Sequence, residues 1–313
     1  MIVTIGEILV EIMATTIGVG FREAQTLVGP FPSGAPAIFI DQVGKLGAPC
    51  GLIGSVGDDD FGRLNLDRLA ADGVDASAIS IEPDIATGSA FVRYRQDGSR
   101  DFIFNIRHSA NSRIALTPAA ERMIAAADHL HVMGSALSIP AVLQLTETAI
   151  ARVKARGGAI SFDPNVRKEM FNDASLGAVL RRVLAAADLF MPSGDEIFLF
   201  APADDWASAA ERLLSSGVRE VVVKRGAAGA EVFSAGTPVD GAPFKVDEVD
   251  PTGAGDCFGA TYVVCRRLGM AADKALQYAN AAGARAVTVK GPMEGASTFA
   301  ELDAFIAARR SGA

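Results

Sequence analysis

Short apolar runs rich in β-branched residues alternate along the chain with longer stretches in which apolar residues recur at helical spacing. The expected strands are residues 2–10, 52–56, 129–133, 159–163, 188–191 and 220–224. The expected helices are residues 35–46, 61–72, 140–156, 175–187, 207–216 and 257–268. Alternation of this kind is typical of a mainly parallel sheet with helices on both faces. The pattern therefore predicts an α/β fold.

Two regions depart from this alternation. Residues 91–95 and 100–104 read as short strands, and between them the Asp97-Gly98 pair is typical of a hairpin turn. Residues 15–36 are glycine-rich and irregular. Because no helix accompanies the hairpin, we expect it to leave the main sheet. Together the two regions predict a small β-lid over the open end of the sheet, and a surface hairpin without a role there is the alternative.

Composition limits the function. The chain has 313 residues, and with 50% of them hydrophobic it can bury a large core. No spacer rich in Pro, Ser or Gly divides it, so we expect one domain over residues 1–313. A net charge of -8 argues against a partner with a phosphate backbone, so no nucleic acid is expected.

The expected location is the cytoplasm. Cys50, Cys257 and Cys265 form no CxxC pair and no metal-ligand spacing, which suits a reducing compartment. The start shows no signal-peptide pattern, and no long uncharged apolar stretch follows. We therefore expect no contact with a membrane.

The strongest chemical signal is the sequence DPTGAGD at residues 250–256, which precedes the apolar helix 257–268. Small residues at a helix start leave backbone N–H groups open, and these suit a phosphate or a developing negative charge. Asp256, in the first turn, could take a proton from an alcohol while the amides stabilise a transferring phosphoryl group. On spacing alone an equal alternative is that Asp256 complements the helix dipole and the glycines serve close packing.

This segment resembles the C-terminal signature of the ribokinase-like, or PfkB-type, carbohydrate kinases. Three further stretches follow the family's order: SGAPA at 33–37 with GSVGDDDFG at 54–62, VKRG at 223–226 with Gly229 and Ala230, and YANAA at 278–282. The likeness runs from Gly6 to about Phe299. It implies a ribokinase-like three-layer α/β/α sandwich with a mainly parallel central sheet. It also implies a single kinase domain with a lid formed from about residues 12–35 and 86–107.

The resemblance implies an ATP-dependent kinase in which Asp256 is the base. The amides of Gly253, Ala254 and Gly255 would form the anion hole. Residues expected on the ATP side are Lys224, Gly226, Gly229 and Asn280, and for each of them a strand-end or turn role is the alternative. Monovalent cations such as K⁺ activate some similar kinases.

Magnesium is expected near residues 193–196. Ser193 stands where many relatives carry the asparagine of Asn-x-x-Glu, while the acid of that motif remains as Glu196. Glu196 would then order water bound to Mg²⁺. The alternative for Ser193 is that it caps a helix over residues 194–200, which is compatible with either role.

The acceptor side departs from the family pattern. Gly34 and Ala35 match the first signature, but Ile38 occupies the position of an asparagine that holds sugar hydroxyls. Glu11 replaces an aspartate that the first strand of many members delivers to the sugar. A glutamate there implies a differently shaped pocket and makes ribose and nucleosides less favoured.

Four further residues are expected at the acceptor. Asp163, Asn165 and Arg167 follow an expected strand, and ligand sites of α/β proteins lie at the carboxyl ends of strands. Arg107 follows the hairpin. The two arginines, together with GPMEGA at 291–296, resemble the branch of 2-keto-3-deoxygluconate kinase and ketohexokinases such as fructokinase and tagatose kinase. Guanidiniums suit a sugar-acid carboxylate, but Arg167 could instead bind ATP phosphates and Arg107 a surface acid.

The sequence thus predicts transfer of the γ-phosphoryl group of ATP, with Mg²⁺, to a hydroxyl of a small sugar or sugar acid. The acceptor would be 2-keto-3-deoxygluconate or a ketohexose such as fructose or tagatose. A sugar-phosphate kinase, a nucleoside kinase and a non-catalytic sugar sensor are the alternatives. Because an open lid edge favours pairing with a second strand, we expect a homodimer joined through the lid.

Overall fold

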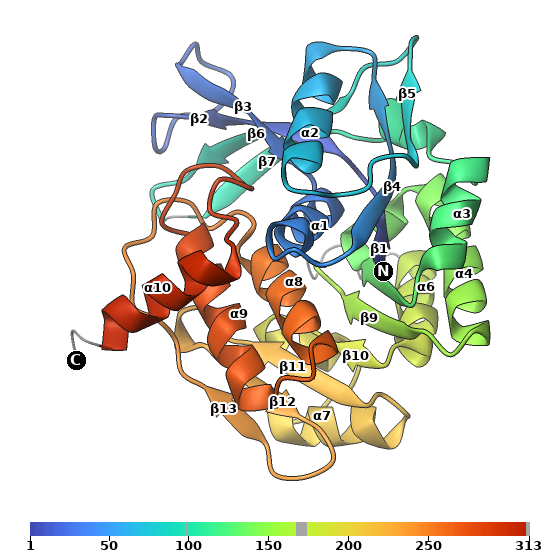
Figure 1. Ribbon diagram of the computed structural model, residues 1–313. Coiled ribbons are helices and arrows are strands. Elements are labelled where there is room, and N and C mark those ends of the chain that lie inside the picture. The colour runs from blue at the N-terminus through green and yellow to red at the C-terminus, as the bar shows by residue number, and fades with distance from the viewer. Residues whose placement is uncertain (98, 167–173, 311–313) are drawn as a thin grey trace.

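The computed structural model describes residues 1–97, 99–166 and 174–310 (Figure 1). Within these residues the main sheet has nine strands, in the order β13-β12-β11-β10-β9-β8-β1-β4-β5. They are β1 (Ile2–Ile5), β4 (Cys50–Gly57), β5 (Ile79–Glu82), β8 (His129–Met133), β9 (Ala159–Asp163), β10 (Leu189–Phe190), β11 (Glu220–Lys224), β12 (Ala230–Phe233) and β13 (Val239–Gly241). Neighbours from β5 to β11 pair parallel, and β12 and β13 extend the sheet antiparallel. The predicted mainly parallel sheet is confirmed.

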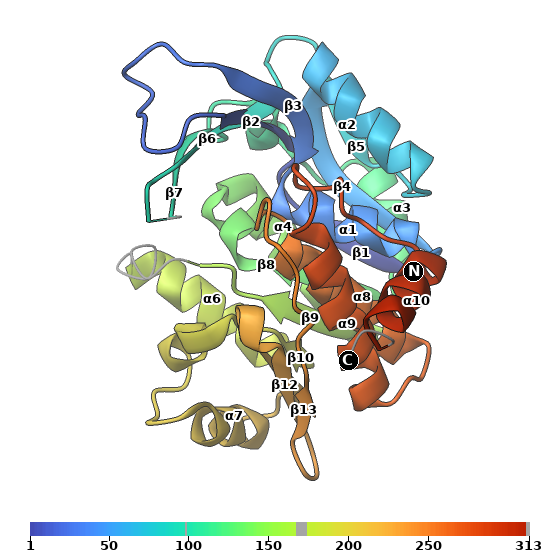
Figure 2. The same ribbon diagram turned by 90° about the vertical axis from the view of Figure 1, so that its left-hand side faces the viewer.

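Helices cover both faces of this sheet, as Figure 2 shows from the side. One layer contains α1 (Ala35–Lys45), α8 (Ala254–Arg267), α9 (Ala272–Ala286) and α10 (Phe299–Arg310). The other contains α4 (Pro140–Ala155), α6 (Ala174–Ala186) and α7 (Trp206–Ser215). Helix α3 (Pro118–Ala126) packs against α4. Helix α2 (Asp60–Ala71) packs against α1 and against strands of both sheets. The α/β/α sandwich is therefore confirmed, and no described helix is long and apolar enough to cross a membrane.

A second, smaller sheet projects from the sandwich at the top of Figure 1. Its order is β3-β2-β6-β7, formed by β2 (Leu9–Ala14), β3 (Leu27–Ser33), β6 (Gly88–Tyr94) and β7 (Arg100–Asn105). Strands β6 and β7 are the predicted hairpin, and they pair antiparallel outside the main sheet, as expected. The region 15–36 is not irregular throughout, because it contains β3.

The single strand expected over residues 2–10 is wrong. The chain forms β1 in the main sheet and β2 in the second sheet, separated by Gly6, Glu7 and Ile8. A β-carbon on Gly6 would lie 2.4 Å from Cγ of Pro36, so the link passes directly against the start of α1. The sequence pattern hides this break because nearly every residue of both strands is buried, which gives one continuous apolar run. The break carries the chain from one sheet to the other beside the carboxyl end of β1.

Candidate active site

Two pockets lie at the carboxyl ends of the parallel strands, and they share a wall made by Lys224, Pro251 and Gly255. The first pocket has a volume of about 800 Å³ and is lined by residues of β7, the β1–β2 link, the end of β9 and the start of α8. The second has a volume of about 620 Å³ and is lined by residues around η4 (Gly226–Ala228) and of α8 and α9. Two ligands, one in each pocket, would therefore meet at the start of α8.

The residues predicted to form the anion hole, Gly253, Ala254 and Gly255, lie at this junction. Gly253 is the N-cap of α8 and has a left-handed φ of 80°. A β-carbon on it would lie 2.2 Å from the carbonyl oxygen of Pro292, so both conformation and space require glycine. No described side chain caps this helix start. The first amides of α8, which include those of Ala254 and Gly255, therefore remain available to an anion.

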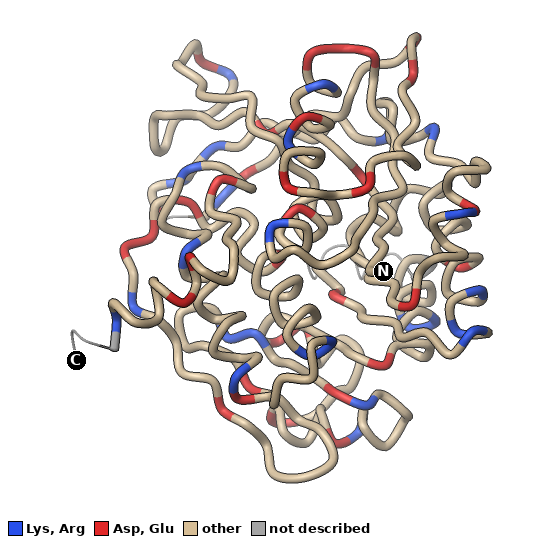
Figure 3. The backbone as a smooth tube through the Cα atoms, viewed as in Figure 1, with Lys and Arg blue, Asp and Glu red and all other residues tan. Residues whose placement is uncertain are grey.

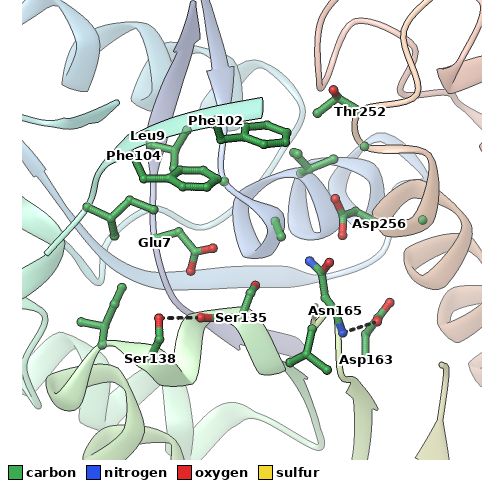
Figure 4. Close-up of a pocket in the computed structure, with 18 of the residues that line it drawn as sticks. Glu7, Leu9, Phe102, Phe104, Ser135, Ser138, Asp163, Asn165, Thr252 and Asp256 are labelled. Carbon is green, nitrogen blue, oxygen red and sulfur yellow. Dashed lines mark hydrogen bonds between the residues drawn. The ribbon is translucent and has the colours of Figure 1, made fainter. Parts of the chain in front are cut away.

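Asp256 lies in the first turn of α8, and its carboxyl faces the first pocket (Figure 4). Burial raises the pKa of this carboxyl to about 8, with a further rise from the charge of Asp163 and an opposing effect of Lys224. A carboxylate with a raised pKa is a stronger base than a solvated one. Once deprotonated, Asp256 could therefore accept a proton from a hydroxyl group in the first pocket.

An ion pair lies next to Asp256. Lys224, at the end of β11, pairs with Asp163 at the end of β9. The Glu196 carboxylate accepts hydrogen bonds from the amides of Ser193 at 2.7 Å and Val166 at 3.0 Å. Burial, followed by the charge of Asp163, raises the pKa of Glu196 to about 7. These groups bring one cation and two carboxyls to the junction.

Ser193 is the N-cap of η3 (Gly194–Leu199), which the capping interpretation expected. The same residue also lines the first pocket. Oxygen ligands suit Mg²⁺, which usually binds through one or two carboxylates together with phosphates and water. Glu196 and Asp163 fit that requirement.

The second pocket brings together the predicted residues Gly226, Gly229 and Asn280. The Asn280 side-chain amide donates to the carbonyl oxygens of Gly241 at 3.0 Å and Ala242 at 3.1 Å, and so holds the loop that follows β13. The remaining wall is mainly apolar or small, and includes Phe244, Val246, Phe258, Gly283, Ala284 and Val287. Such a slot suits a flat, largely apolar ring system.

Most of the predicted acceptor residues line the first pocket. Gly34, Ala35, Asp163, Asn165 and Arg107 all do so. The backbone of Asn165 is left-handed, with a φ of 40°, and its N–H donates to Asp163 Oδ1 at 3.2 Å (Figure 4). The Arg107 side chain is exposed. Arg167 lies outside the described residues.

Glu11 does not line either pocket. It is 3% exposed on β2, and it accepts long hydrogen bonds from Ser33 Oγ at 3.4 Å and Thr252 Oγ1 at 3.5 Å. Burial, with a contribution from Asp250, raises the pKa of Glu11 to about 7. Glu11 therefore lies in a contact between the second sheet and the loop at residues 250–252.

That contact extends across the second sheet, and we call it the sheet–loop cluster: Glu11, Ser33, Tyr94, Arg100, Asp250 and Thr252. Arg100 Nη1 donates to Thr252 Oγ1 at 2.6 Å, and Thr252 Oγ1 donates to Asp250 Oδ1 at 2.8 Å. The Tyr94 hydroxyl lies 3.4 Å from Asp250 Oδ1. Each of the four strands described in this sheet supplies one member. The loop that leads into the start of α8 is thus held by the second sheet.

Basic positions are visible on β6 and β7 in Figure 3. Arg93 and Arg95 both pair with Asp101 within the second sheet. Arg100 instead reaches across to the loop and lines the first pocket. The local sequence does not indicate which of these three arginines reaches the loop, and only the structure shows it.

Several pocket residues were missed by the sequence analysis. They are Glu7, Leu9, Arg100, Phe102, Phe104, Ser135 and Ser138. For Glu7 a signal was present, because an acid directly follows the apolar strand Ile2–Ile5 and Gly6. Phe102 and Phe104 occupy alternate positions of β7, so their rings share one face and stack with centroids 5.1 Å apart. The serines lie on η2 (Gly134–Ser138), which has no comparable signal.

Comparison with known proteins agrees with this geometry. The model of the pfkB family carbohydrate kinases matches residues 1–298. A fructokinase of Vibrio alginolyticus is 32% identical, over 91% of this chain and 94% of its own length. A 2-dehydro-3-deoxygluconokinase of Thermoproteus tenax is 31% identical, over 94% of this chain and 90% of its own.

Among solved structures, a candidate ribokinase II from E. coli is 50% identical, with a TM-score of 0.94 over 98% of this chain and 99% of that one. The same protein in complex with ATP and Mg²⁺ gives a TM-score of 0.93. The chain therefore belongs to the pfkB family of carbohydrate kinases. It is a sugar kinase with a ribokinase-like fold, as the motifs predicted.

Proposed function

We propose that this kinase transfers the γ-phosphoryl group of ATP to a hydroxyl of a six-carbon 2-keto sugar or sugar acid. The observation that carries the proposal is the position of Asp256. Its carboxyl faces the first pocket, while the adjacent residues Ala254 and Gly255 line the second. The E. coli relative was solved in complex with ATP and Mg²⁺, which supports ATP as the phosphoryl donor. The largely apolar slot of the second pocket supports it as the site of the nucleotide ring.

The reaction follows from this arrangement. A hydroxyl of the acceptor in the first pocket donates to Asp256, and its oxygen attacks the γ-phosphorus. The new oxygen–phosphorus bond forms as the bond between the γ-phosphorus and the bridging oxygen of ADP breaks, and the hydroxyl proton passes to Asp256. The amides at the start of α8, with Lys224 nearby, stabilise the charge on the transferring group. Mg²⁺, when bound, neutralises phosphate charge, and we assign Glu196 to hold it through water.

The acceptor class rests on two observations. Relatives named fructokinase and 2-dehydro-3-deoxygluconokinase support a 2-keto sugar as the acceptor. The compound in the second name, 2-dehydro-3-deoxygluconate, is the same as 2-keto-3-deoxygluconate. Arg100 and Arg107 both line the first pocket and can bind a carboxylate. We therefore place 2-keto-3-deoxygluconate first and neutral ketohexoses second. Activation by K⁺ and a cytoplasmic location remain predictions.

An ADP-release assay with Mg-ATP tests the proposal against 2-keto-3-deoxygluconate, fructose, tagatose, ribose, adenosine and fructose 6-phosphate. Preference for the keto acid would support carboxylate binding by the arginines. Preference for a neutral ketohexose would leave the kinase activity as proposed and would contradict the binding of an acceptor carboxylate by the arginines. Turnover of none of these compounds, with ATP still bound, would contradict the proposed acceptor class.

We also propose that the second sheet closes over the first pocket as a lid and joins two copies as a homodimer. In support, β7 is an edge strand, and its residues Ile103 and Phe104 are 56% and 54% exposed. Light scattering at micromolar concentration should give twice the mass of the chain. A monomer mass would contradict the dimer.

A further inference from the structure

The Glu7 side chain enters the first pocket from the link between β1 and β2. In Figure 4 its carboxyl faces the same space as that of Asp256. Glu7 is 6% exposed, and no described residue donates a hydrogen bond to its Oε2. Burial raises the pKa of Glu7 to about 7, opposed only by its own backbone amide. A buried polar atom without a hydrogen-bond partner is unfavourable. A bound ligand that donates a hydrogen bond to this oxygen would remove that cost, since the described protein residues supply no donor.

The backbone on both sides of Glu7 is held in place. The Gly6 amide donates to the Ile53 carbonyl at 3.1 Å. The Ile8 amide donates to Asn111 Oδ1 at 2.9 Å, and Asn111 Nδ2 donates back to the Ile8 carbonyl at 3.0 Å. A β-carbon on Gly34 would lie 2.4 Å from the Glu7 carbonyl oxygen, so the start of α1 packs directly against this residue. The backbone therefore fixes the point from which the Glu7 side chain enters the first pocket.

The surroundings of Glu7 match one part of a sugar. Figure 4 shows Phe104 on one side of the carboxyl and Ser138 on the other. The stacked rings of Phe102 and Phe104 give an apolar wall suited to the C–H face of a sugar ring. Ser135 Oγ, which also lines the pocket, has no hydrogen-bond partner among the described residues. The site thus offers open hydrogen-bonding groups beside an apolar surface.

We propose that Glu7 determines acceptor specificity: its open Oε2 accepts a hydrogen bond from a sugar hydroxyl other than the one that Asp256 deprotonates. This inference rests on the proposed function of the first pocket. An acceptor that carries this hydroxyl supplies the missing donor, and an analogue without it leaves a buried oxygen unpaired. Sites built to bond a substrate hydroxyl reject analogues that lack it for this reason.

The test compares Glu7→Gln and Glu7→Ala with the wild-type enzyme. Acceptor Kd is measured by isothermal titration calorimetry, and kcat and KM by ADP release, with 2-keto-3-deoxygluconate and D-fructose. For Glu7→Ala we expect acceptor Kd and KM to rise about tenfold or more, the scale of a lost hydrogen bond to a charged group. The values of kcat and of ATP Kd should stay within about threefold, because Glu7 binds the acceptor and not the reacting atoms.

Monodeoxy analogues of the preferred acceptor identify the partner hydroxyl. One analogue should lose about tenfold or more in kcat/KM with the wild-type enzyme and lose nothing further with Glu7→Ala. A structural role for Glu7 would lower activity with all analogues equally, so this pattern separates the two. Glu82→Gln on β5, which lines neither pocket, is the matched control and should leave every constant unchanged.

The outcomes distinguish the inference from the function on which it rests. If the wild-type enzyme uses a sugar and both Glu7 variants keep its Kd and its analogue preferences, the inference is wrong and the kinase assignment stands. If the wild-type enzyme neither binds nor phosphorylates any acceptor tested, both fail. If Glu7→Ala does not fold, the isosteric Glu7→Gln carries the same test, since it exchanges one acceptor oxygen for a donor without changing volume.

Discussion

The two pockets that meet at the start of α8 are built in different ways. The pocket that we assign to the nucleotide uses small residues, backbone and apolar side chains from the last third of the chain, between Lys224 and Val287. The pocket that we assign to the acceptor is lined by charged and aromatic side chains between Glu7 and Asp256, supplied by both sheets. Its polar groups include two open oxygens, on Glu7 and Ser135. In this assignment, ATP is bound by one stretch of the chain, whereas the acceptor is bound by residues that lie far apart in the sequence.

Asp256→Asn should give the largest effect, because it removes the base from the acceptor side and leaves the nucleotide side intact. We expect kcat to fall by about two to four orders of magnitude, the scale for a general base. ATP Kd from calorimetry should not change. A variant that retains its turnover would remove Asp256 from the role of base.

Gly253→Ala tests the junction that serves both pockets. Its β-carbon would meet the Pro292 carbonyl at 2.2 Å, so the backbone amides at the start of α8, which we propose as the anion hole, must shift. We expect kcat to fall by about one to three orders of magnitude, as for the loss of one oxyanion donor. Gly269→Ala, at the other end of α8, is the matched control, since its φ of 78° imposes the same strain but nothing lies within 4 Å. Equal losses in both variants would indicate a general effect on folding.

The pH dependence of turnover should be set by Asp256, which faces the pocket that we assign to the acceptor. Asp256 acts only when deprotonated, and its pKa is raised to about 8. We therefore expect kcat/KM for the acceptor to rise about tenfold per pH unit up to about pH 8 and then to level. Lys224→Met removes the charge that lowers this pKa, so the rise of kcat/KM should shift to higher pH. A rise that is complete near pH 4 would contradict the buried environment described for Asp256.

Arg100→Met should have a smaller effect that is confined to the acceptor. It breaks the bond from the second sheet to Thr252 and removes a cation from the first pocket. We expect kcat/KM for the acceptor to fall about tenfold, while KM for ATP changes little. Arg95→Met is the control, because Arg95 pairs with Asp101 within the second sheet. An equal loss in both variants would show that the sheet–loop cluster has no special role.

The sequence predicted the parts of the molecule that depend on local pattern. The strands β8, β9 and β11 appear as short apolar runs, and the DPTGAGD segment lies at the start of α8 as expected. The break between β1 and β2 escaped prediction because both strands are buried, so the apolar run is continuous across it.

The same break bears on the acceptor side. Motif position pointed to Glu11, which lines neither pocket and contacts Thr252, whereas the turn at residues 6–8 places Glu7 in the wall of the first pocket. The partners of Arg100 and Glu11 lie more than 150 residues away at Thr252. Contacts of that range depend on how the two sheets pack, and no local pattern encodes them.

A structure of the enzyme with an ATP analogue, Mg²⁺ and the preferred acceptor tests the central claim most directly. The account predicts the nucleotide ring in the pocket beside Asn280, the terminal phosphate at the amides of residues 253–255, and an acceptor hydroxyl within hydrogen-bond distance of Asp256. A second acceptor hydroxyl should lie at Glu7. An acceptor bound away from Asp256, or a nucleotide bound in the first pocket, would contradict it.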